Sequence, residues 1–328
     1  MPLKILTNMA FWQSPEWRGA ASSIYNLTDS GCGDKPLSAW GEALKLFRGA
    51  GGCDVVLTMG ARTSLFYALL CWLSARPSRQ IMTEIFMDED RPRNPIWKLK
   101  TALFRIAARR AMGILTNSSM EVPHIAERCS IPDGRVRYVP LCSNIRNPAI
   151  SQRDDGYVLS AGRTLRDYDL LLKAAETLNY PVVLVCGKGD LAGRQMPSNV
   201  TVYAEIPKDR YLHLLDACSV VVVPLIPVKR ATGQVVVLEA MARGKPVIAT
   251  RNPGTADLME HGVNGYLVEP GDADGLRTAI ATMMRDAALR KKCAEAGLRV
   301  LNERFSMDRH VARKLREIED LYRESKNQ

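Results

Sequence analysis

The segment Ala231–Thr250, ATGQVVVLEAMARGKPVIAT, decides the fold class of this chain. Thr232, Gly233 and Gln234 form a turn of small residues that opens a helix. The N-terminus of such a helix presents backbone N–H groups and a positive dipole end to an anion. The apolar helix body ends at Gly244, and the β-branched residues after it predict a buried strand. A helix, a turn and a strand in this order are typical of α/β proteins.

The carboxylate of Glu239 is the second feature of this helix. Glu239 follows Gly233 by six residues, so its carboxylate stands more than one turn, or about 9 Å, beyond the anion site. Ribose hydroxyls are a natural partner for a carboxylate at that distance from a bound phosphate. The segment therefore predicts a nucleotide diphosphate site, and we expect Glu239→Ala to weaken nucleotide binding without unfolding the protein. An ordinary helix, turn and strand of an α/β protein is the alternative.

Two neighbouring segments resemble the C-terminal half of family 4 glycosyltransferases. They are GQVVVLEAMARGKPVIAT at 233–250 and NPGTADLMEHGVNGYLVEPGD at 252–272. The resemblance is clearest from about Tyr157 to Phe305, and the N-terminal half matches only loosely. It implies the GT-B fold, an α/β architecture of two Rossmann-like, doubly wound parallel-sheet domains that face a central cleft. It also implies a retaining sugar transfer from a nucleoside-diphosphate sugar.

Composition and charge agree with a soluble enzyme of this size. The 328 residues suffice for two domains, and 46% hydrophobic with 24% charged residues is typical of globular proteins. No apolar run of membrane-spanning length is found, and a strand-like segment begins at once, which predicts a cytoplasmic protein. The net charge of +10 implies an anionic partner. Because the charge is spread evenly, we expect no nucleic acid. The eight dispersed cysteines are predicted to be reduced.

Both halves of the chain repeat one plan of short β-rich runs separated by helical patterns, which predicts a parallel sheet in each. The runs lie at 3–8, 54–60, 80–86, 113–118 and 136–141, and at 157–162, 181–187, 200–206, 219–225 and 246–251. The aperiodic polar stretch 143–156 predicts a linker. We expect an acceptor-binding domain at 1–148 and a nucleotide-sugar-binding domain at 149–305. By resemblance, a helical segment at 306–328 packs back on the first domain.

A second phosphate-binding element is predicted at 160–174, SAGRTLRDYDLLLKA, where a strand ends in Gly162 before an amphipathic helix. Guanidinium groups bridge phosphate oxygens, so Arg163 and Arg166 are predicted to hold the diphosphate. They would stabilise the charge that grows on it as the glycosidic bond breaks. The family carries an arginine and usually a lysine here, and Arg166 takes the place of the lysine at a shorter spacing. A solvated surface charge is the alternative for each arginine.

The sugar and base contacts follow the family pattern less closely. The family often has a Glu-x7-Glu pair whose first member contacts the donor sugar, whereas Ala231 stands eight residues before Glu239. The backbone amides of the turn and the side chain of Gln234 remain to hold the phosphate or the sugar. By resemblance, Glu205 and Ile206 at the end of a strand are expected to contact the base.

Acceptor recognition is expected in the N-terminal half. Trp17 offers a stacking surface, and Arg18 and Gly19 form a close-approach turn, in the place of a glycine-containing loop of the family. Partial burial in the core is the alternative for Trp17. Asp88, in an acidic cluster after the third strand, is predicted to lie near the acceptor hydroxyl, with solvent exposure as its alternative. By resemblance, the leaving phosphate helps to take the acceptor proton, so no dedicated base is required.

The helix predicted at 94–113, NPIWKLKTALFRIAARRAMG, is the main argument for a membrane partner. Leu99, Leu103 and Ile106 form one face, and five lysines and arginines make the rest basic. This pattern is typical of a helix attracted to anionic lipid, on a protein that is peripheral on the inner face of the membrane. The alternative is a packed helix whose apolar stripe covers the sheet.

Metal and hydrolytic chemistry find no support in the sequence. The four histidines lie far apart, and neither a Gly-x-Ser-x-Gly nor a Walker lysine motif is present. We therefore predict a metal-independent retaining glycosyltransferase of the hexosyltransferase type that needs no cofactor. Its acceptor would be a glycan or a lipid-linked molecule in cell-surface polysaccharide or glycolipid synthesis. The alternatives are a catalytically idle nucleotide-sugar-binding or membrane scaffold protein, and a nucleotide-sugar epimerase.

Overall fold

The chain folds into two compact units, each built around its own sheet. The computed structural model describes residues 2–9, 11, 14–24, 37–86 and 94–327. Unit 1 contains Met1–Pro140 and Asp308–Gln328, and unit 2 contains Leu141–Met307. Each unit has a six-stranded sheet in the part of the chain that is described, and all strand pairs in both sheets are parallel.

The sheet of unit 1 has the strand order β2-β1-β3-β4-β5-β6. Its strands are β1 (Ile5–Thr7), β2 (Ala21–Ser23), β3 (Val55–Met59), β4 (Gln80–Thr83), β5 (Gly113–Thr116) and β6 (Val136–Tyr138). Its helices are α1 (Pro15–Ala20), α2 (Ala39–Gly49), α3 (Ala61–Leu73), α4 (Pro95–Arg110), α5 (Glu121–Cys129) and α12 (Met307–Lys326), with a 3-10 turn at Asp133–Arg135. Because β1 and β3 are neighbours, the winding of the chain reverses direction between them.

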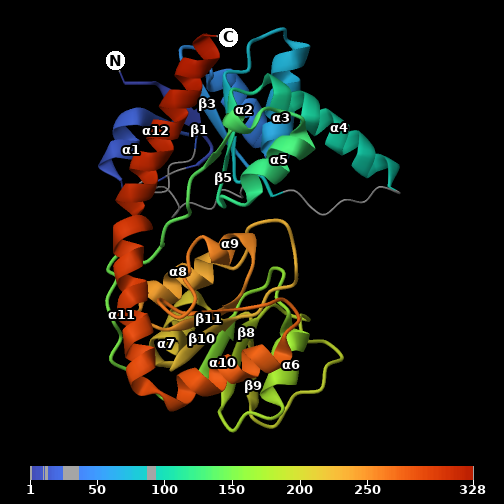
Figure 1. Cartoon of the computed structure of the whole chain (residues 1–328). Helices are drawn as coiled ribbons and strands as arrows, with labels where there is room; N and C mark the ends of the chain where they lie inside the picture. Colours follow the sequence, from blue (N-terminus) through green and yellow to red (C-terminus); the bar gives the residue numbers. More distant parts are fainter. Residues whose placement is uncertain (1, 10, 12–13, 25–36, 87–93, 328) are drawn as a thin grey trace. The chain divides into compact units, whose positions relative to one another are not determined.

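The last helix completes unit 1, although it comes from the far end of the sequence. Figure 1 shows α12, in red, alongside the blue elements α1 and β1 of this unit. Leu321 of α12 lies so close to β5 that a Cβ atom at Gly113 would stand 2.7 Å from its methyl groups. Val311 and Ile318 of the same helix are fully buried. A glycine on β5 therefore makes room for the helix.

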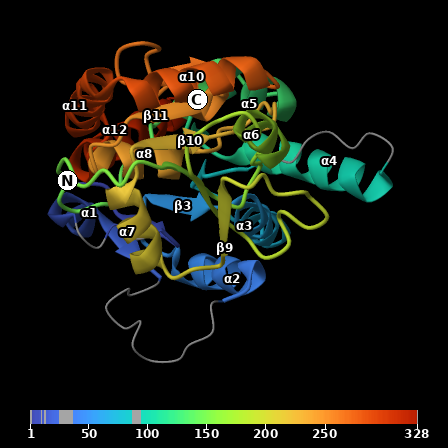
Figure 2. The same ribbon diagram turned by 90° about the horizontal axis from the view of Figure 1, so that it is seen from below.

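The sheet of unit 2 has the order β12-β11-β10-β7-β8-β9. Its strands are β7 (Val158–Ala161), β8 (Val182–Cys186), β9 (Val200–Ala204), β10 (Val220–Val223), β11 (Val247–Thr250) and β12 (Tyr266–Val268). Its helices are α6 (Tyr168–Ala175), α7 (Lys208–Ala217), α8 (Gln234–Ala242), α9 (Pro253–Ala256), α10 (Ala273–Arg285) and α11 (Ala287–Arg304). Figure 2 shows several of these helices from a second direction.

Alternation along the strands of unit 2 builds one core on each face of the sheet. Val220 and Val222 pack with residues of α6 and α10, whereas Val221 and Val223 pack with residues of α7 and α8. Successive side chains of a strand point to opposite faces, so the all-valine strand β10 serves both cores. A central strand that is covered on both faces is therefore apolar throughout.

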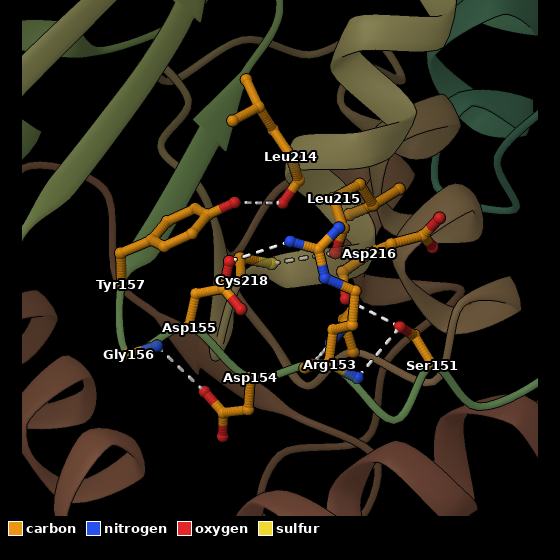
Figure 3. Close-up of polar contacts among 11 residues, drawn as sticks. Ser151, Arg153, Asp154, Asp155, Gly156, Tyr157, Leu214, Leu215, Asp216 and Cys218 are labelled. Atoms are coloured by element: carbon orange, nitrogen blue, oxygen red, sulfur yellow. Dashed lines mark hydrogen bonds and ion pairs between the residues drawn. The ribbon is translucent and has the colours of Figure 1, made fainter.

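The polar stretch 143–156, which the sequence predicts as a linker, and the adjoining Tyr157 belong to unit 2. Figure 3 shows that the Tyr157 hydroxyl donates to the Leu214 carbonyl at 2.6 Å, and that Ser151 Oγ donates to the Asp216 carbonyl at 2.7 Å. Ala149 N also donates to the Ala242 carbonyl at 2.8 Å. The two compact units divide at Pro140/Leu141 and at Met307/Asp308, whereas the sequence predicts boundaries at 148/149 and 305/306.

The ten strand runs expected from the sequence all contain a strand, so the α/β prediction is confirmed. Two further strands, β2 and β12, were not expected. Each has only three residues, and Ala21–Ser23 has no β-branched or alternating pattern. Pairing with a neighbouring strand, and not local preference, makes these segments extended.

Candidate functional site

The carboxyl edge of the unit 2 sheet has a topological switch point between β7 and β10. From β7 the chain proceeds to β8 and β9 on one side, and then returns to place β10 on the other. Open α/β sheets bind ligands outside the carboxyl ends of strands at such a point. The two loops that leave it contact each other, because Asp167 N donates to the Pro224 carbonyl at 3.1 Å and Ile226 N to the Leu165 carbonyl at 3.2 Å.

The turn before α8 lies in the second of these loops and is closely packed. Gly233 is the N-cap residue with φ of 80°, and no side chain caps the helix. A Cβ atom at Gly233 would lie 3.0 Å from the methyl groups of Val223 and Leu225. Gly254 at the start of α9 packs so tightly that its Cβ would stand 2.7 Å from the Thr232 carbonyl oxygen. The structure thus holds the predicted anion turn rigidly.

The two arginines of the other loop have different surroundings. Arg166 is half-buried, and its Nε and Nη1 donate to the Ala161 and Thr164 carbonyls at 2.9 Å each. Burial lowers the pKa of this guanidinium. A Cβ atom at Gly162 would overlap it, which explains the glycine. Arg163 is exposed and has no hydrogen bond or ion pair with the described residues. Arg166 therefore stabilises the loop, whereas the charge of Arg163 is available to bind a ligand.

Glu239 is 2% exposed, and three donors hold its carboxylate. Asn144 Nδ2 donates to Oε1 at 2.8 Å, the Tyr211 hydroxyl donates to Oε2 at 2.8 Å, and Lys208 Nζ forms an ion pair with Oε1. Burial, and then the charge of Glu239, raise the pKa of the Tyr211 hydroxyl. The lysine side chain is half-exposed, whereas the carboxylate is enclosed. A ribose would therefore have to displace or share one of these donors.

The segment predicted to contact the base lies at the end of β9. Glu205 is exposed and has φ of 51°, a left-handed conformation uncommon for a residue with a side chain. Ile206 is half-buried and packs on the core shared with α7 and α8. Two residues later Lys208 begins α7 and bonds Glu239. The structure thus joins the predicted base segment and the predicted ribose carboxylate through one lysine.

Sequence reasoning missed the partners of Glu239 and one buried amide. Asn144 belongs to the stretch taken for a linker, and Lys208 and Tyr211 stand on α7, where no motif marks them. Asn252 is 4% exposed, and its Nδ2 has no hydrogen-bond partner among the described residues. It lies two residues after the end of β11, and its Oδ1 accepts from Gly254 N at 3.0 Å. It therefore places a buried donor beside the glycine that contacts the Thr232 turn.

The acceptor residues predicted in unit 1 are not arranged as expected. Trp17 is 2% exposed and contacts the Phe11 ring edge-on at 5.2 Å, so the prediction of a stacking surface was wrong. Arg18 and Gly19 lie within α1 and not in a turn, and a Cβ atom at Gly19 would meet nothing within 4 Å. Pro15 and the Ser14 cap start this helix. Asp88 lies outside the described residues.

Other features of the described chain bear on the remaining predictions. Its seven described cysteines are free, and in this part of the chain no three histidine, cysteine or acidic side chains are grouped as metal ligands would be. None of the helices described here combines the length and apolar character needed to cross a bilayer.

Comparison with known sequences finds similarity in the second half of the chain. Residues 143–300 match the family model described as glycosyl transferases group 1. The lipopolysaccharide core biosynthesis glycosyltransferase LpsE of Rhizobium meliloti is 41% identical over 73 residues, which cover 22% of each chain. The N-acetyl-alpha-D-glucosaminyl L-malate synthase of Bacillus anthracis is 34% identical over 92 residues, which cover 28% of this chain and 24% of that protein. The chain thus spans about a quarter or less of these relatives in the matched regions.

Solved structures extend the likeness to the whole chain. HepE of Anabaena in complex with UDP has a TM-score of 0.69 at 16% identity, with 100% of this chain and 99% of that one covered. Sucrose-phosphate synthase of Thermosynechococcus elongatus has a TM-score of 0.68 at 16% identity, with 98% and 88% covered. The fold is therefore GT-B. The sequence matches show that residues 143–300 are similar to glycosyl transferases group 1, and the solved structures show the fold of the whole chain.

Proposed function

We propose that the protein transfers a sugar, with retention of configuration, from a nucleoside-diphosphate sugar to a glycan or lipid-linked acceptor. The observation that carries this proposal is the contact, at the switch point of unit 2, between the loop after β7 and the start of the loop after β10, in which Leu165 and Asp167 bond Ile226 and Pro224. The first of these loops carries the exposed guanidinium of Arg163, and the second leads to the N-terminus of α8, which no described side chain caps. A guanidinium and a helix N-terminus both suit a diphosphate. HepE, which shares the fold, was solved with UDP, and this supports a nucleotide donor.

Each residue of this site has a proposed role. Arg163 binds the diphosphate and stabilises the charge that develops on it, and Arg166 positions the loop that carries Arg163. The amides of the Gly233 turn complete the phosphate contacts, Glu239 receives the ribose, and Glu205 and Ile206 line the base. Of the predicted acceptor contacts, the exposed Arg18 and Gly19 remain candidates, as does Asp88 for a polar contact with the acceptor hydroxyl.

The proposed reaction balances without a metal, a cofactor or a dedicated base. The bond between the anomeric carbon and the diphosphate oxygen breaks on the same face on which the bond to the acceptor oxygen forms. The acceptor hydroxyl gives its proton to the departing phosphate oxygen. Arg163 and the α8 dipole take the role that a divalent cation has in other enzymes that use nucleotide sugars.

Donor binding is the first test of this proposal. Titration with UDP-, GDP- and ADP-sugars should show one preferred nucleotide, and Arg163→Ala should weaken it by about tenfold to a hundredfold, because a charge-assisted phosphate contact is lost. Arg299→Ala provides the matched control, since Arg299 is an exposed arginine on α11. Equal affinity in the wild type and the Arg163 variant would remove Arg163 from the site. The anomeric configuration of the product, read by NMR, tests retention.

A catalytically idle nucleotide-sugar binder remains the second candidate. It is favoured by Ala231, which is buried where the family often has a sugar-binding glutamate, and by Glu239, whose carboxylate already has three partners. Slow release of free sugar from the bound donor distinguishes the two functions. A transferase hydrolyses its donor when no acceptor is present, whereas an idle binder returns it intact.

A cytoplasmic protein held at the inner face of the membrane would meet a lipid-linked acceptor where that acceptor resides. The positive net charge of the chain supports this location.

A further inference from the structure

Helix α4 presents an apolar stripe to solvent instead of to the sheet. Ile96, Leu99, Leu103 and Ile106 follow one another by three, four and three residues, so they share one face of the helix. Ile96 is 63% exposed, Leu99 61% and Ile106 48%. The buried residues of α4 are Phe104, Ala107 and Ala108, which pack on the core of unit 1. The exposed residues of the stripe therefore do not contribute to the core of unit 1.

Cations border the stripe, and no acidic residue accompanies them. The five basic residues of α4 are Lys98, Lys100, Arg105, Arg109 and Arg110, and the segment Pro95–Arg110 contains neither aspartate nor glutamate. A basic helix with an exposed apolar stripe is the pattern of a helix that lies in the interface of an anionic membrane.

Four of the five cations of α4 divide into two pairs by their contacts. Arg105 Nε donates to the Arg128 carbonyl at 2.7 Å, and Arg109 Nε to the Ser130 carbonyl at 3.4 Å, which ties the C-terminal half of α4 to the end of α5. Lys98 and Lys100 are exposed and make no hydrogen bond or ion pair to any part of the chain that is described. Their charges are available to an external partner.

The position of α4 in unit 1 makes its stripe accessible. Figures 1 and 2 show the N-terminal part of α4 extending away from the sheet of this unit. Asn94 caps the helix by accepting a bond from Trp97 N at 3.1 Å, so the projecting end is well formed. At this end Trp97 is half-buried, and the Arg128 guanidinium lies 5.5 Å from its ring centroid.

We propose that the stripe of α4 docks unit 1 on an anionic phospholipid surface, with Leu99 and Ile106 entering the acyl boundary and Lys98 and Lys100 contacting the headgroups. The biological use of this contact rests on the proposed function, because it would bring the enzyme to a lipid-linked acceptor. The docking itself needs neither donor nor acceptor.

Flotation with phosphatidylcholine vesicles, with and without phosphatidylglycerol, tests this proposal. The wild type should float only with phosphatidylglycerol, and high salt should release it. Leu99→Gln with Ile106→Gln should reduce partition by about a hundredfold, because two large side chains no longer enter the apolar phase. Val263→Gln is the control, since Val263 is 42% exposed in unit 2.

A second pair of variants tests the charges. Lys98→Gln with Lys100→Gln should reduce partition by about thirtyfold, from the usual attraction of each cation to an anionic surface. Lys291→Gln with Lys292→Gln, at exposed positions of α11, removes the same charge elsewhere and should change partition little. All these side chains are exposed, so the melting temperatures should stay close to that of the wild type.

Several outcomes would overturn the docking surface. These are absence of flotation by the wild type, equal flotation with and without phosphatidylglycerol, and α4 variants that float as the wild type does. A dimer in sedimentation that dissociates in the Leu99/Ile106 variant, without vesicle binding, would assign the stripe to a second copy of the chain. Donor titration of the same proteins separates this result from the proposed function, because the α4 variants should retain donor affinity.

Discussion

At the scale of single residues, the charged groups of the candidate site divide into those that hold the fold and those that remain available. The Arg166 guanidinium donates to two backbone carbonyls. The Glu239 carboxylate accepts hydrogen bonds from three side-chain donors. Arg163 has no such partner in the described chain and is exposed. The sequence cannot separate these cases, because Arg163 and Arg166 differ only in what surrounds them after folding.

The partners of Glu239 change the expectation for its replacement. Glu239→Ala would leave the Asn144 amide and the Tyr211 hydroxyl without their acceptor, and each orphaned donor costs about 1–3 kcal/mol. We therefore expect a loss of about 3 kcal/mol in the free energy of unfolding, besides weaker donor binding. Urea denaturation measures the first effect and calorimetric titration the second. Glu295→Ala, at a half-exposed carboxylate on α11, should change neither.

At the scale of elements, the segments that the sequence predicts are present, but their faces and ends depend on packing. The helix α4 lies where it was predicted, yet Phe104, Ala107 and Ala108 cover the sheet and the Leu99/Ile106 stripe does not. Small alanine side chains allow close approach to the core, which the larger aliphatic residues of the other face would prevent. An amphipathic pattern therefore predicts where a helix lies. When a helix has two apolar sides, as α4 has, the pattern does not predict which side is buried.

The α8 turn gives a test at this scale. Gly233 and Gly271 have nearly equal φ, 80° and 79°, but only Gly233 has atoms near the position of a Cβ. Gly271→Ala should cost about 1 kcal/mol from the left-handed backbone alone. Gly233→Ala should cost about 1 kcal/mol more, because the methyl group meets the side chains of Val223 and Leu225. It should also weaken donor binding. Equal costs in urea denaturation would show that the turn has room for a side chain.

At the scale of the whole molecule, residues far apart in sequence complete each unit. His310 of α12 is 2% exposed, and its Nδ1 donates to the Pro140 carbonyl at 2.6 Å, which joins the end of the first segment of unit 1 to the start of its last helix. Burial, and then the charge of Lys314, lower the pKa of His310 from 6.5 to about 3. The folded protein therefore holds this imidazole neutral.

This histidine predicts a pH dependence of stability. Between pH 6.5 and pH 3 the unfolded chain binds a proton that the folded chain does not, so the free energy of unfolding falls as the pH falls. Full stability is expected above pH 6.5, and by pH 5 His310 alone should remove about 2 kcal/mol. Urea denaturation at several pH values measures this slope. His310→Gln should flatten it, whereas His213→Gln, at an exposed position, should leave it unchanged.

The sequence by itself determined the α/β class, ten of the strands, and the turn and helix of α8, because alternation, β-branched runs and glycine turns are local signals. It also indicated Arg163 and Glu239, whose positions follow from their spacing along the chain. Only the tertiary structure decided that Glu239 is enclosed by donors from α7 and from Asn144, that Trp17 is buried, and that α4 turns Leu99 and Ile106 outward. Those outcomes depend on which segments meet in space, and no local pattern encodes such contacts.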